Sequence, residues 1–379
     1  MATSLFQVNF PQAESSQQSV DEADYIIGLD LHKKTTAVCV IDVRNPNQPV
    51  WQRKRLKNID LLEKINLFKG KKVVVAEASY GWFPLREALK NLDAVTFVTL
   101  DPRKTSSWIE TSGIKNDKID AQVLAYATLH GGVPRLAVHQ PSPEAKENFR
   151  LVNLRDKYVQ GRTRIKNQLK AIDRDYGVNP YTGEMPEKSE LVKEMENALL
   201  DQLEFLDEHI GKTEKLMAQL AERDEIISHL KTIPGIGSIT AFALRFKIET
   251  LNRFQNPPKL SAYFGFGVRE HQSGDHLVKG KISKTGNSLI RKLLIQGAQV
   301  VRFRRPDLIQ LYFPNLGHEE AMRDNKHANK VATALARKNL AFVFQLWKKN
   351  QDFDLSAYRE KRASLSDNIV PSPKAAELE

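Results

Sequence analysis

Four acidic residues in the first third of the chain have the types and spacing to share one divalent-metal site. Asp30 lies in the run YIIGLDLHKKT, and Glu77 lies in KVVVAEAS. Asp117 and Asp120 lie in KNDKIDA, three residues apart, so on a helix they project from one face. Carboxylates held close together repel one another and raise one another's pKa, and a divalent cation removes that conflict. The pattern therefore predicts a metal site made of these four acids.

The metal expected at this site is Mg²⁺, with Mn²⁺ as a substitute. Mg²⁺ prefers hard oxygen ligands, and two such ions about 3.5–4 Å apart clamp the attacking and leaving oxygens of a phosphodiester. Asp30 has the position from which to bridge both ions. The alternative is an acidic surface patch with two aspartates near a helix start, where a carboxylate complements the helix dipole.

The residues that must position these acids show alternating strand and helix patterns over 25–135. We expect strands at 25–31, 35–42, 50–56, 72–76 and 94–100. We expect helices at 59–68, 82–92 and 119–129. The first two strands are expected to form a hairpin. Three leading strands followed by helix and strand in alternation is the order of an α/β RNase H-like (RuvC-like) domain.

Residues 136–231 are predicted to form a helical linker, broken at 176–188. An apolar stripe repeats there at spacings of four and three, as in a coiled-coil seam. The stripe consists of Leu199, Leu203, Leu206, Ile210, Thr213, Met217 and Leu220. A helical hairpin packed within one chain gives the same stripe, so dimerisation is one of two interpretations. The preceding helix carries Arg162, Lys166 and Lys170 on one face, which either follows phosphates or is solvated.

Residues 232–350 are predicted to form a second, mainly α domain. Residues 261–350 hold 16 Lys and Arg against 6 Asp and Glu, so nearly all of the net charge of +11 lies there. Such a surface favours an anionic partner. The run TIPGIG resembles a helix-hairpin-helix loop, in which Gly235 and Gly237 let backbone N–H groups meet a phosphate. A structural turn is the alternative.

A polar stretch of this second domain offers a serine nucleophile. Nucleic-acid binding is predicted for the basic residues around it, which are Arg269, Lys279, Lys281, Lys284 and Arg291. A serine hydroxyl is a weak nucleophile until cations or a base activate it. From chemistry alone, Ser273, Ser283 and Ser288 are all candidates, although Ser288 is better suited to the start of a helix.

Composition limits the remaining classes of protein. The chain has 379 residues, 41% hydrophobic and 27% charged, which suits two or three globular domains. Its one cysteine, Cys39, excludes a disulfide within the chain and fits a reducing compartment as a small buried hydrophobe. The sequence shows neither an apolar run of about 18 residues nor a signal peptide, so we expect a cytoplasmic, nucleoid-associated protein with no membrane partner. Residues 1–24 are expected to be a disordered tail and 351–379 a polar tail.

Together these motifs resemble the insertion-sequence transposases of the IS110 family with its IS1111 subgroup, and the related Piv-type DNA invertases. The resemblance runs from about residue 25 to residue 347. It rests on GLDLHK, EAS, KNDKIDA, IPGIG and FGFGVREHQSGDHLVKGKISKTGNSLIRKLL. It implies a DEDD domain like that of RuvC-type Holliday-junction resolvases, followed by a C-terminal serine transposase domain. The catalytic residues it implies are Asp30, Glu77, Asp117, Asp120 and Ser273.

The resemblance also implies a reaction and its partners. Ser273 would attack a DNA phosphate and stay bonded to the 5′ phosphate while a 3′-OH leaves. The implied partners are donor and target DNA, further copies of the chain in a dimer or tetramer, and an element-encoded bridge RNA that pairs with both DNAs. A Piv-like member would work without RNA.

Two other functions fit part of the sequence. One is a resolvase-like nuclease that uses Mg²⁺ and no serine chemistry. The other is a nucleic-acid-binding scaffold with a dead active site, against which the presence of all four acids argues.

Overall fold

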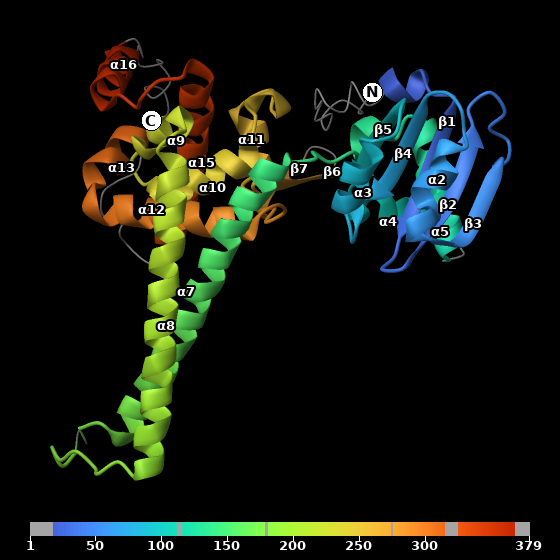
Figure 1. The fold of residues 1–379 in the computed structure, drawn as a ribbon. Coiled ribbons are helices and arrows are strands. Elements are labelled where there is room, and N and C mark those ends of the chain that lie inside the picture. The colour runs from blue at the N-terminus through green and yellow to red at the C-terminus, as the bar shows by residue number, and fades with distance from the viewer. Residues whose placement is uncertain (1–17, 112–115, 179–180, 274–275, 315–324, 368–379) are drawn as a thin grey trace. The chain divides into compact units, whose positions relative to one another are not determined.

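The computed structural model describes residues 18–111, 116–178, 181–273, 276–314 and 325–367 (Figure 1). These residues form two compact units. Unit 1 contains the described residues up to Gln140 together with Asn252–Gln255. Unit 2 contains Pro141–Leu251 and the described residues from Asn256 onward. Among the described residues, every helix is too short or too polar to cross a lipid bilayer.

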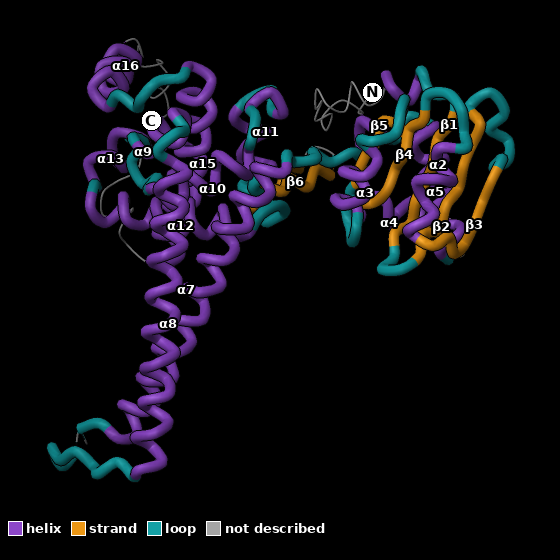
Figure 2. The backbone as a smooth tube through the Cα atoms, in the orientation of Figure 1, coloured by secondary structure: helices purple, strands orange, loops and turns teal. Residues whose placement is uncertain are grey.

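A mixed five-stranded sheet with the order β3-β2-β1-β4-β5 forms the centre of unit 1 (Figure 2). Its strands are β1 (Tyr25–Leu31), β2 (Thr35–Asp42), β3 (Trp51–Lys57), β4 (Lys72–Glu77) and β5 (Val95–Leu100). The first three strands pair antiparallel, β4 runs parallel to β1, and β5 runs parallel to β4. The predicted strands and the predicted first hairpin are confirmed, with ends that differ by at most one residue.

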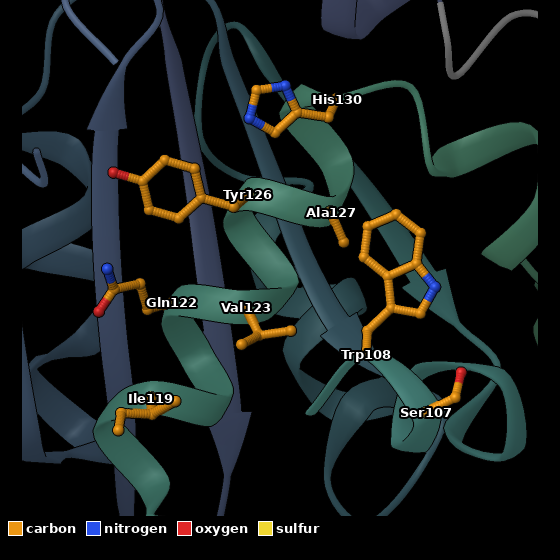
Figure 3. A pocket seen from close by; sticks show the side chains of 8 residues that line it. All are labelled: Ser107, Trp108, Ile119, Gln122, Val123, Tyr126, Ala127 and His130. Carbon is orange, nitrogen blue, oxygen red and sulfur yellow. The ribbon is translucent and has the colours of Figure 1, made fainter. Parts of the chain in front are cut away.

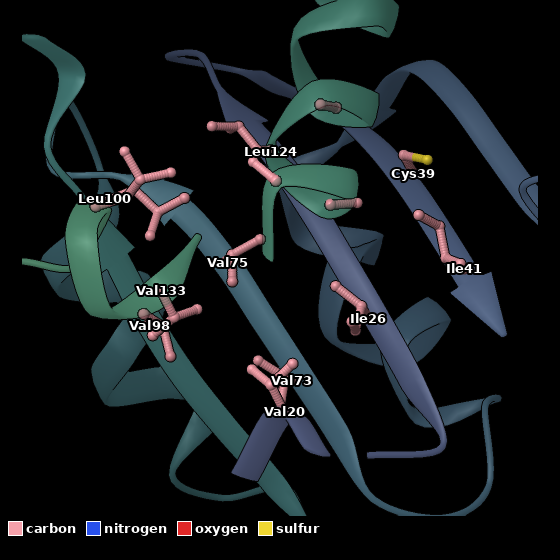
Figure 4. Packing of buried hydrophobic residues seen from close by; sticks show 14 of the residues in the cluster. Val20, Ile26, Cys39, Ile41, Val73, Val75, Val98, Leu100, Leu124 and Val133 are labelled. Atoms are coloured by element: carbon pink, nitrogen blue, oxygen red, sulfur yellow. The ribbon is translucent and has the colours of Figure 1, made fainter. Parts of the chain in front are cut away.

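Helices cover both faces of this sheet because successive strand side chains point to opposite sides. Ile26 and Cys39 pack beneath α5 (Asp117–Leu129), as Figure 4 shows. Ile27 and Leu29 face the other side, in one cluster with residues of α2 (Leu61–Asn66) and α3 (Trp82–Leu89). The remaining short elements of unit 1 are η1 (Asn58–Asp60), α4 (Pro102–Thr111) and α6 (Val133–Leu136).

Helix α5 lies directly against β1 at Gly28. A Cβ atom at Gly28 would stand 2.1 Å from the carbonyl oxygen of Ala121 and 2.8 Å from the backbone nitrogen of Ala125. Only glycine leaves room for this approach of helix to strand. The contact fixes the start of α5 above the end of β1.

Folded structure extends into both segments that were predicted to be tails, 1–24 and 351–379. Val20 and Ala23 are buried in the core of unit 1, so residues 18–24 belong to that unit rather than to a tail. At the other end, α16 (Leu355–Asp367) lies within the segment predicted to be a polar tail. Phe353 and Tyr358 of this end make ring contacts with Phe342, at 4.9 and 5.4 Å between centroids.

Two long helices dominate unit 2, α7 (Pro143–Tyr176) and α8 (Glu190–Ala221), which lie side by side (Figure 1). The break predicted between them is confirmed. Most of the predicted apolar stripe of α8 is covered within the same chain, since Ile210, Thr213 and Met217 are buried and only Leu220 at its end is exposed. The helices are also joined by Arg155, whose Nη2 lies 2.7 Å from Oε1 of Glu214. The hairpin interpretation therefore accounts for the stripe.

The rest of unit 2 is mainly helical, as predicted, and includes one β-hairpin that was not predicted. The hairpin pairs β6 (Val268–Ser273) with β7 (His276–Ile282). The other elements are α9 (Glu225–Lys231), α10 (Ser238–Ile248), α11 (Pro257–Tyr263), α12 (Ser288–Arg304), α13 (Pro306–Tyr312) and α15 (Asn325–Lys349). The short η2 (Leu251–Arg253) spans the boundary, with Asn252 and Arg253 in unit 1.

Candidate active site

The four predicted acids converge at one edge of the sheet in unit 1. Asp30 is near the end of β1, and Glu77 is the last residue of β4. These strands are parallel neighbours paired through Leu29 and Ala76, so their carboxyl ends meet at the same edge. Asp117 and Asp120 lie in the first turn of α5, which Gly28 allows to rest on β1.

The pKa of Asp30 reflects how close the other acids lie. Its pKa is raised above the usual value, first because the carboxylate is largely buried. Repulsion from Asp120, Asp117 and Glu77 raises it further, and the nearby His32 partly offsets the rise. The ionised carboxylates thus oppose one another, which is the condition that a bound cation relieves.

A histidine that the sequence analysis did not single out belongs to the same cluster. Nε2 of His32 lies 3.2 Å from Oδ2 of Asp30 and 3.6 Å from Oδ2 of Asp117. One ligand atom from each of the three residues lies within 4.8 Å of the other two. The spacing of His32 from Asp30 was an available indication, because residues two apart on an extended chain point to the same side.

Neighbouring side chains fix the acids in place. The hydroxyl of Thr105 donates a hydrogen bond to Oε1 of Glu77. Oδ1 of Asn116 accepts from the backbone nitrogens of Lys118 and Ile119, both at 3.1 Å, and so caps the turn that carries Asp117. The set of carboxylate oxygens with one imidazole nitrogen suits a divalent cation, and its side chains remain partly open to solvent.

One further acid at this edge has a structural role. Asp101 directly follows β5 and precedes α4. Burial would raise its pKa, but hydrogen bonds from Arg103 outweigh burial and hold it below the usual value. The two side chains meet with Nε to Oδ1 at 3.1 Å and Nη2 to Oδ2 at 3.0 Å. The carboxylate of Asp101 is therefore engaged in hydrogen bonds with Arg103 at the start of α4.

A groove of about 740 Å³ lies between α4 and α5 in unit 1 (Figure 3). Its lining residues are Ser107, Trp108, Ile119, Gln122, Val123, Tyr126, Ala127 and His130. The rings of Tyr126 and His130 are stacked, with centroids 6.2 Å apart. None of the lining side chains is acidic, so the groove is distinct from the acidic cluster.

The predicted serine nucleophile lies in unit 2. Ser273 is the last residue of β6, and its backbone pairs with His276 of β7. Residues 274–275 lie outside the described residues, and so do the side chains of Arg269, Ser273 and Lys279. Lys281 and Lys284, on the following segment, are both exposed.

The other predicted residues of this region have clear places. Oγ of Ser283 is hydrogen-bonded to the hydroxyl of Thr285 at 2.9 Å. Ser288 is the first residue of α12, which confirms the expectation that it begins a helix. Nη1 of Arg291 donates to three carbonyl oxygens, those of Phe264, Thr285 and Gly286, at 3.0, 3.0 and 3.2 Å. The guanidinium of Arg291 thus holds the turn before α12 together.

The glycines and basic residues predicted to meet phosphates differ in their surroundings. Gly235 has a φ of 86°, and a Cβ there would lie 2.9 Å from the carbonyl oxygen of Gly297 on α12. Gly237 precedes α10 and would have open space around a Cβ. On α7, Nη1 of Arg162 lies 3.0 Å from Oδ1 of Asp207, whereas Lys166 and Lys170 are exposed.

Two family models match the chain. Residues 27–175 match the DEDD model of the IS110 transposases, described as "Transposase". Residues 227–313 match the model "Transposase IS116/IS110/IS902 family". The two stretches together cover more than half of the chain and contain the acidic cluster and the β6–β7 hairpin.

Similar proteins include transposases and a DNA-inverting protein. The chain is 26% identical to the transposase for insertion sequence element IS1111A of Coxiella burnetii, over 88% of this chain and 92% of that protein. It is 26% identical to the IS1328 transposase of Yersinia enterocolitica, over 83% and 93%. It is 28% identical to the pilin gene-inverting protein of Moraxella bovis, over 41% and 46%. The chain belongs to the IS110/IS116/IS902 family of transposases, enzymes that cleave and rejoin DNA.

Proposed function

We propose that unit 1 is an RNase H-like (RuvC-like) domain whose four acids bind Mg²⁺, or Mn²⁺ in its place, to act on DNA. The observation that carries this proposal is the convergence of Asp30, Glu77, Asp117 and Asp120 at one sheet edge. Three antiparallel strands followed by two parallel ones match the expected strand order. A divalent ion at this site would stabilise the negative charge that develops on a scissile phosphate.

The chain's own residues would prepare this site for DNA. Thr105 orients the Glu77 carboxylate, and Asn116 holds the first turn of α5 with Asp117. Asp30, at the centre of the cluster, would face the ion from the strand side. The side chains of Asp30 and Asp117 are 25% and 36% exposed, which leaves room for a phosphodiester.

We propose Ser273 as the nucleophile. Its hydroxyl oxygen would form a bond to phosphorus while the bond from phosphorus to the 3′ oxygen breaks, and the hydroxyl proton would pass to the departing 3′ oxygen. The resulting phosphoserine keeps the phosphodiester's energy, so rejoining to a new strand needs no ATP. The support for Ser273 is its motif, its place at the end of β6 and the basic residues around it.

The partners would be donor and target DNA and an element-encoded bridge RNA that supplies sequence choice by base pairing. Exposed Lys166, Lys170, Lys281 and Lys284 are suited to nucleic-acid backbones, which carry the sequence-independent part of binding. The acids belong to unit 1 and Ser273 to unit 2, so a composite site requires the two units to meet, within one chain or between copies in an oligomer.

A covalent-adduct assay tests the function. The protein is produced with the DNA that flanks its gene, so that any RNA is present, and is incubated with Mg²⁺ and junction DNA before denaturing electrophoresis. We expect an adduct that disappears in Ser273→Ala and in Asp30→Ala. An adduct that survives Ser273→Ala would refute the assignment of the nucleophile.

The same assay separates the alternatives. Metal-dependent free DNA ends without an adduct would establish the resolvase-like nuclease. Salt-sensitive DNA binding with no strand breakage in Mg²⁺ or Mn²⁺, with the RNA supplied, would establish the scaffold.

A further inference from the structure

The imidazole of His32 stands where a ligand of the acidic site would stand. Its Nε2 lies 3.2 Å from Oδ2 of Asp30 and 3.6 Å from Oδ2 of Asp117. Adjacent ligand atoms around an octahedral ion with bonds of 2.0–2.1 Å are about 3.0 Å apart, because they span an edge of the octahedron. The 3.2 Å distance is close to that edge and the 3.6 Å distance is longer, and all three ligand atoms lie within 4.8 Å of one another. Modest side-chain movements would therefore let the three atoms share one ion.

The turn that carries His32 is held in place independently of the acids. Nδ2 of Asn58 donates to the carbonyl oxygens of His32 and Lys33, at 3.0 and 3.4 Å. Oδ1 of Asn58 accepts from the hydroxyl of Thr36 at 2.8 Å, and the backbone nitrogen of His32 donates to Thr35 at 3.0 Å. These bonds use the backbone of His32, which leaves the imidazole available to the cluster.

We propose that His32 supplies a nitrogen ligand to a divalent ion bound by Asp30 and Asp117, and that it thereby raises the affinity of this site for Mn²⁺ relative to Mg²⁺. The inference rests on the proposed metal site. Mg²⁺ favours all-oxygen surroundings, whereas imidazole nitrogen favours the first-row transition ions. A ligand set of two carboxylates and one imidazole therefore favours Mn²⁺ over Mg²⁺ more strongly than four carboxylates alone do.

The opposing interpretation is that a protonated His32 only bridges the two carboxylates by hydrogen bonds. In that case the imidazolium competes with the ion, and its removal leaves metal binding unchanged or makes it tighter. The two interpretations predict opposite signs for the effect of His32→Ala on Mn²⁺ affinity.

Pulsed electron paramagnetic resonance of bound Mn²⁺ tests the proposal directly, because it detects coupling to a ligating ¹⁴N nucleus. The untagged full-length protein receives less than one equivalent of Mn²⁺. We expect imidazole ¹⁴N coupling in the wild type and in His130→Ala, a matched control at an exposed histidine of the same unit. We expect that coupling to be absent in His32→Ala, with Mn²⁺ affinity lowered about tenfold or more and Mg²⁺ affinity lowered less.

His32→Gln provides a second variant, since its side chain retains an oxygen donor. It should bind Mn²⁺ without nitrogen coupling and shift the preference toward Mg²⁺. Bound Mn²⁺ that depends on Asp30 but shows no ¹⁴N coupling in the wild type would overturn the role of His32 alone. Mn²⁺ binding that is unaffected by Asp30→Asn, or that does not occur, would overturn the metal site itself.

Discussion

At neutral pH the Asp30 carboxylate should destabilise the folded protein without metal, but it should strengthen the proposed metal binding. Since its folded pKa is raised, its contribution to stability is full below the unfolded value of 3.8 and is lost as the pH rises through the folded pKa. At neutral pH without metal, Asp30→Asn should therefore leave the melting temperature unchanged or raise it. A cation at a hundred times its Kd should stabilise the wild type by about 2.7 kcal/mol and the variant far less.

Thermal denaturation in EDTA and in excess Mg²⁺ measures both effects. Asp101→Asn is the matched control, because that carboxylate is engaged by Arg103. The control should lower the melting temperature in both buffers and keep the Mg²⁺-dependent rise. An Asp30→Asn protein that melts lower than the wild type in EDTA would contradict the account of repulsion at this site.

Cys39 should be chemically inert in the folded protein. The sequence predicted a small buried hydrophobe, and the side chain is fully buried in the core beneath α5. Burial raises the pKa of its thiol to about 12. At pH 8 about one thiol in ten thousand is then ionised, and the thiolate is the reactive form. We expect no reaction with a thiol reagent at pH 8 until denaturant is added, when one thiol per chain should react.

At the scale of elements, the contact between α5 and β1 brings Asp117 and Asp120 close to Asp30. Gly28→Ala would place a methyl group against the backbone of α5 and push the helix outward. Overpacking of this kind typically costs about 1–3 kcal/mol, and a clash with backbone lies at the upper end. Because Asp117 and Asp120 move with α5, metal affinity should fall as well.

Gly211→Ala is the control for this substitution. Gly211 lies within α8 with open space around a Cβ, so alanine there should stabilise the protein by about 0.5–1 kcal/mol. Denaturant unfolding and Mn²⁺ titration of the two variants check the prediction. Equal metal affinity in Gly28→Ala and the wild type would show that α5 does not control the acids.

Some elements of the fold are predictable from the sequence and others are not, for physical reasons. β1, β2 and β4 were predictable because buried strands are apolar runs, and the acids at their ends follow from strand order. The β6–β7 hairpin was not, because its strands VREHQS and HLVKGKI mix charge into both faces and lack a clear apolar side. α16 was missed because a few aromatic contacts anchor it, and His32 because a His-Lys-Lys run also suits an exposed turn.

At the scale of the whole molecule, the strongly basic segment and the acidic cluster lie in different units. Residues 261–350 carry nearly all of the net charge, whereas unit 1 carries the acidic cluster. We expect the basic segment to hold DNA by its backbone, while the clustered acids repel DNA until a cation binds. DNA binding should therefore survive removal of divalent metal, although cleavage should not.

The dependence of DNA affinity on salt tests this division. Each phosphate contact contributes about −0.9 to the slope of log K against log salt concentration, because DNA binding releases counterions. Lys281→Ala combined with Lys284→Ala should weaken binding and make the slope shallower by about two. Lys64→Ala is the control, because Lys64 lies on α2 and its Nζ is 3.3 Å from Oε1 of Glu63. The salt dependence of this variant should match that of the wild type. Fluorescence anisotropy of labelled duplex DNA at several salt concentrations measures the DNA affinity of the wild type and both variants. An unchanged slope in the double variant would place the DNA on another surface.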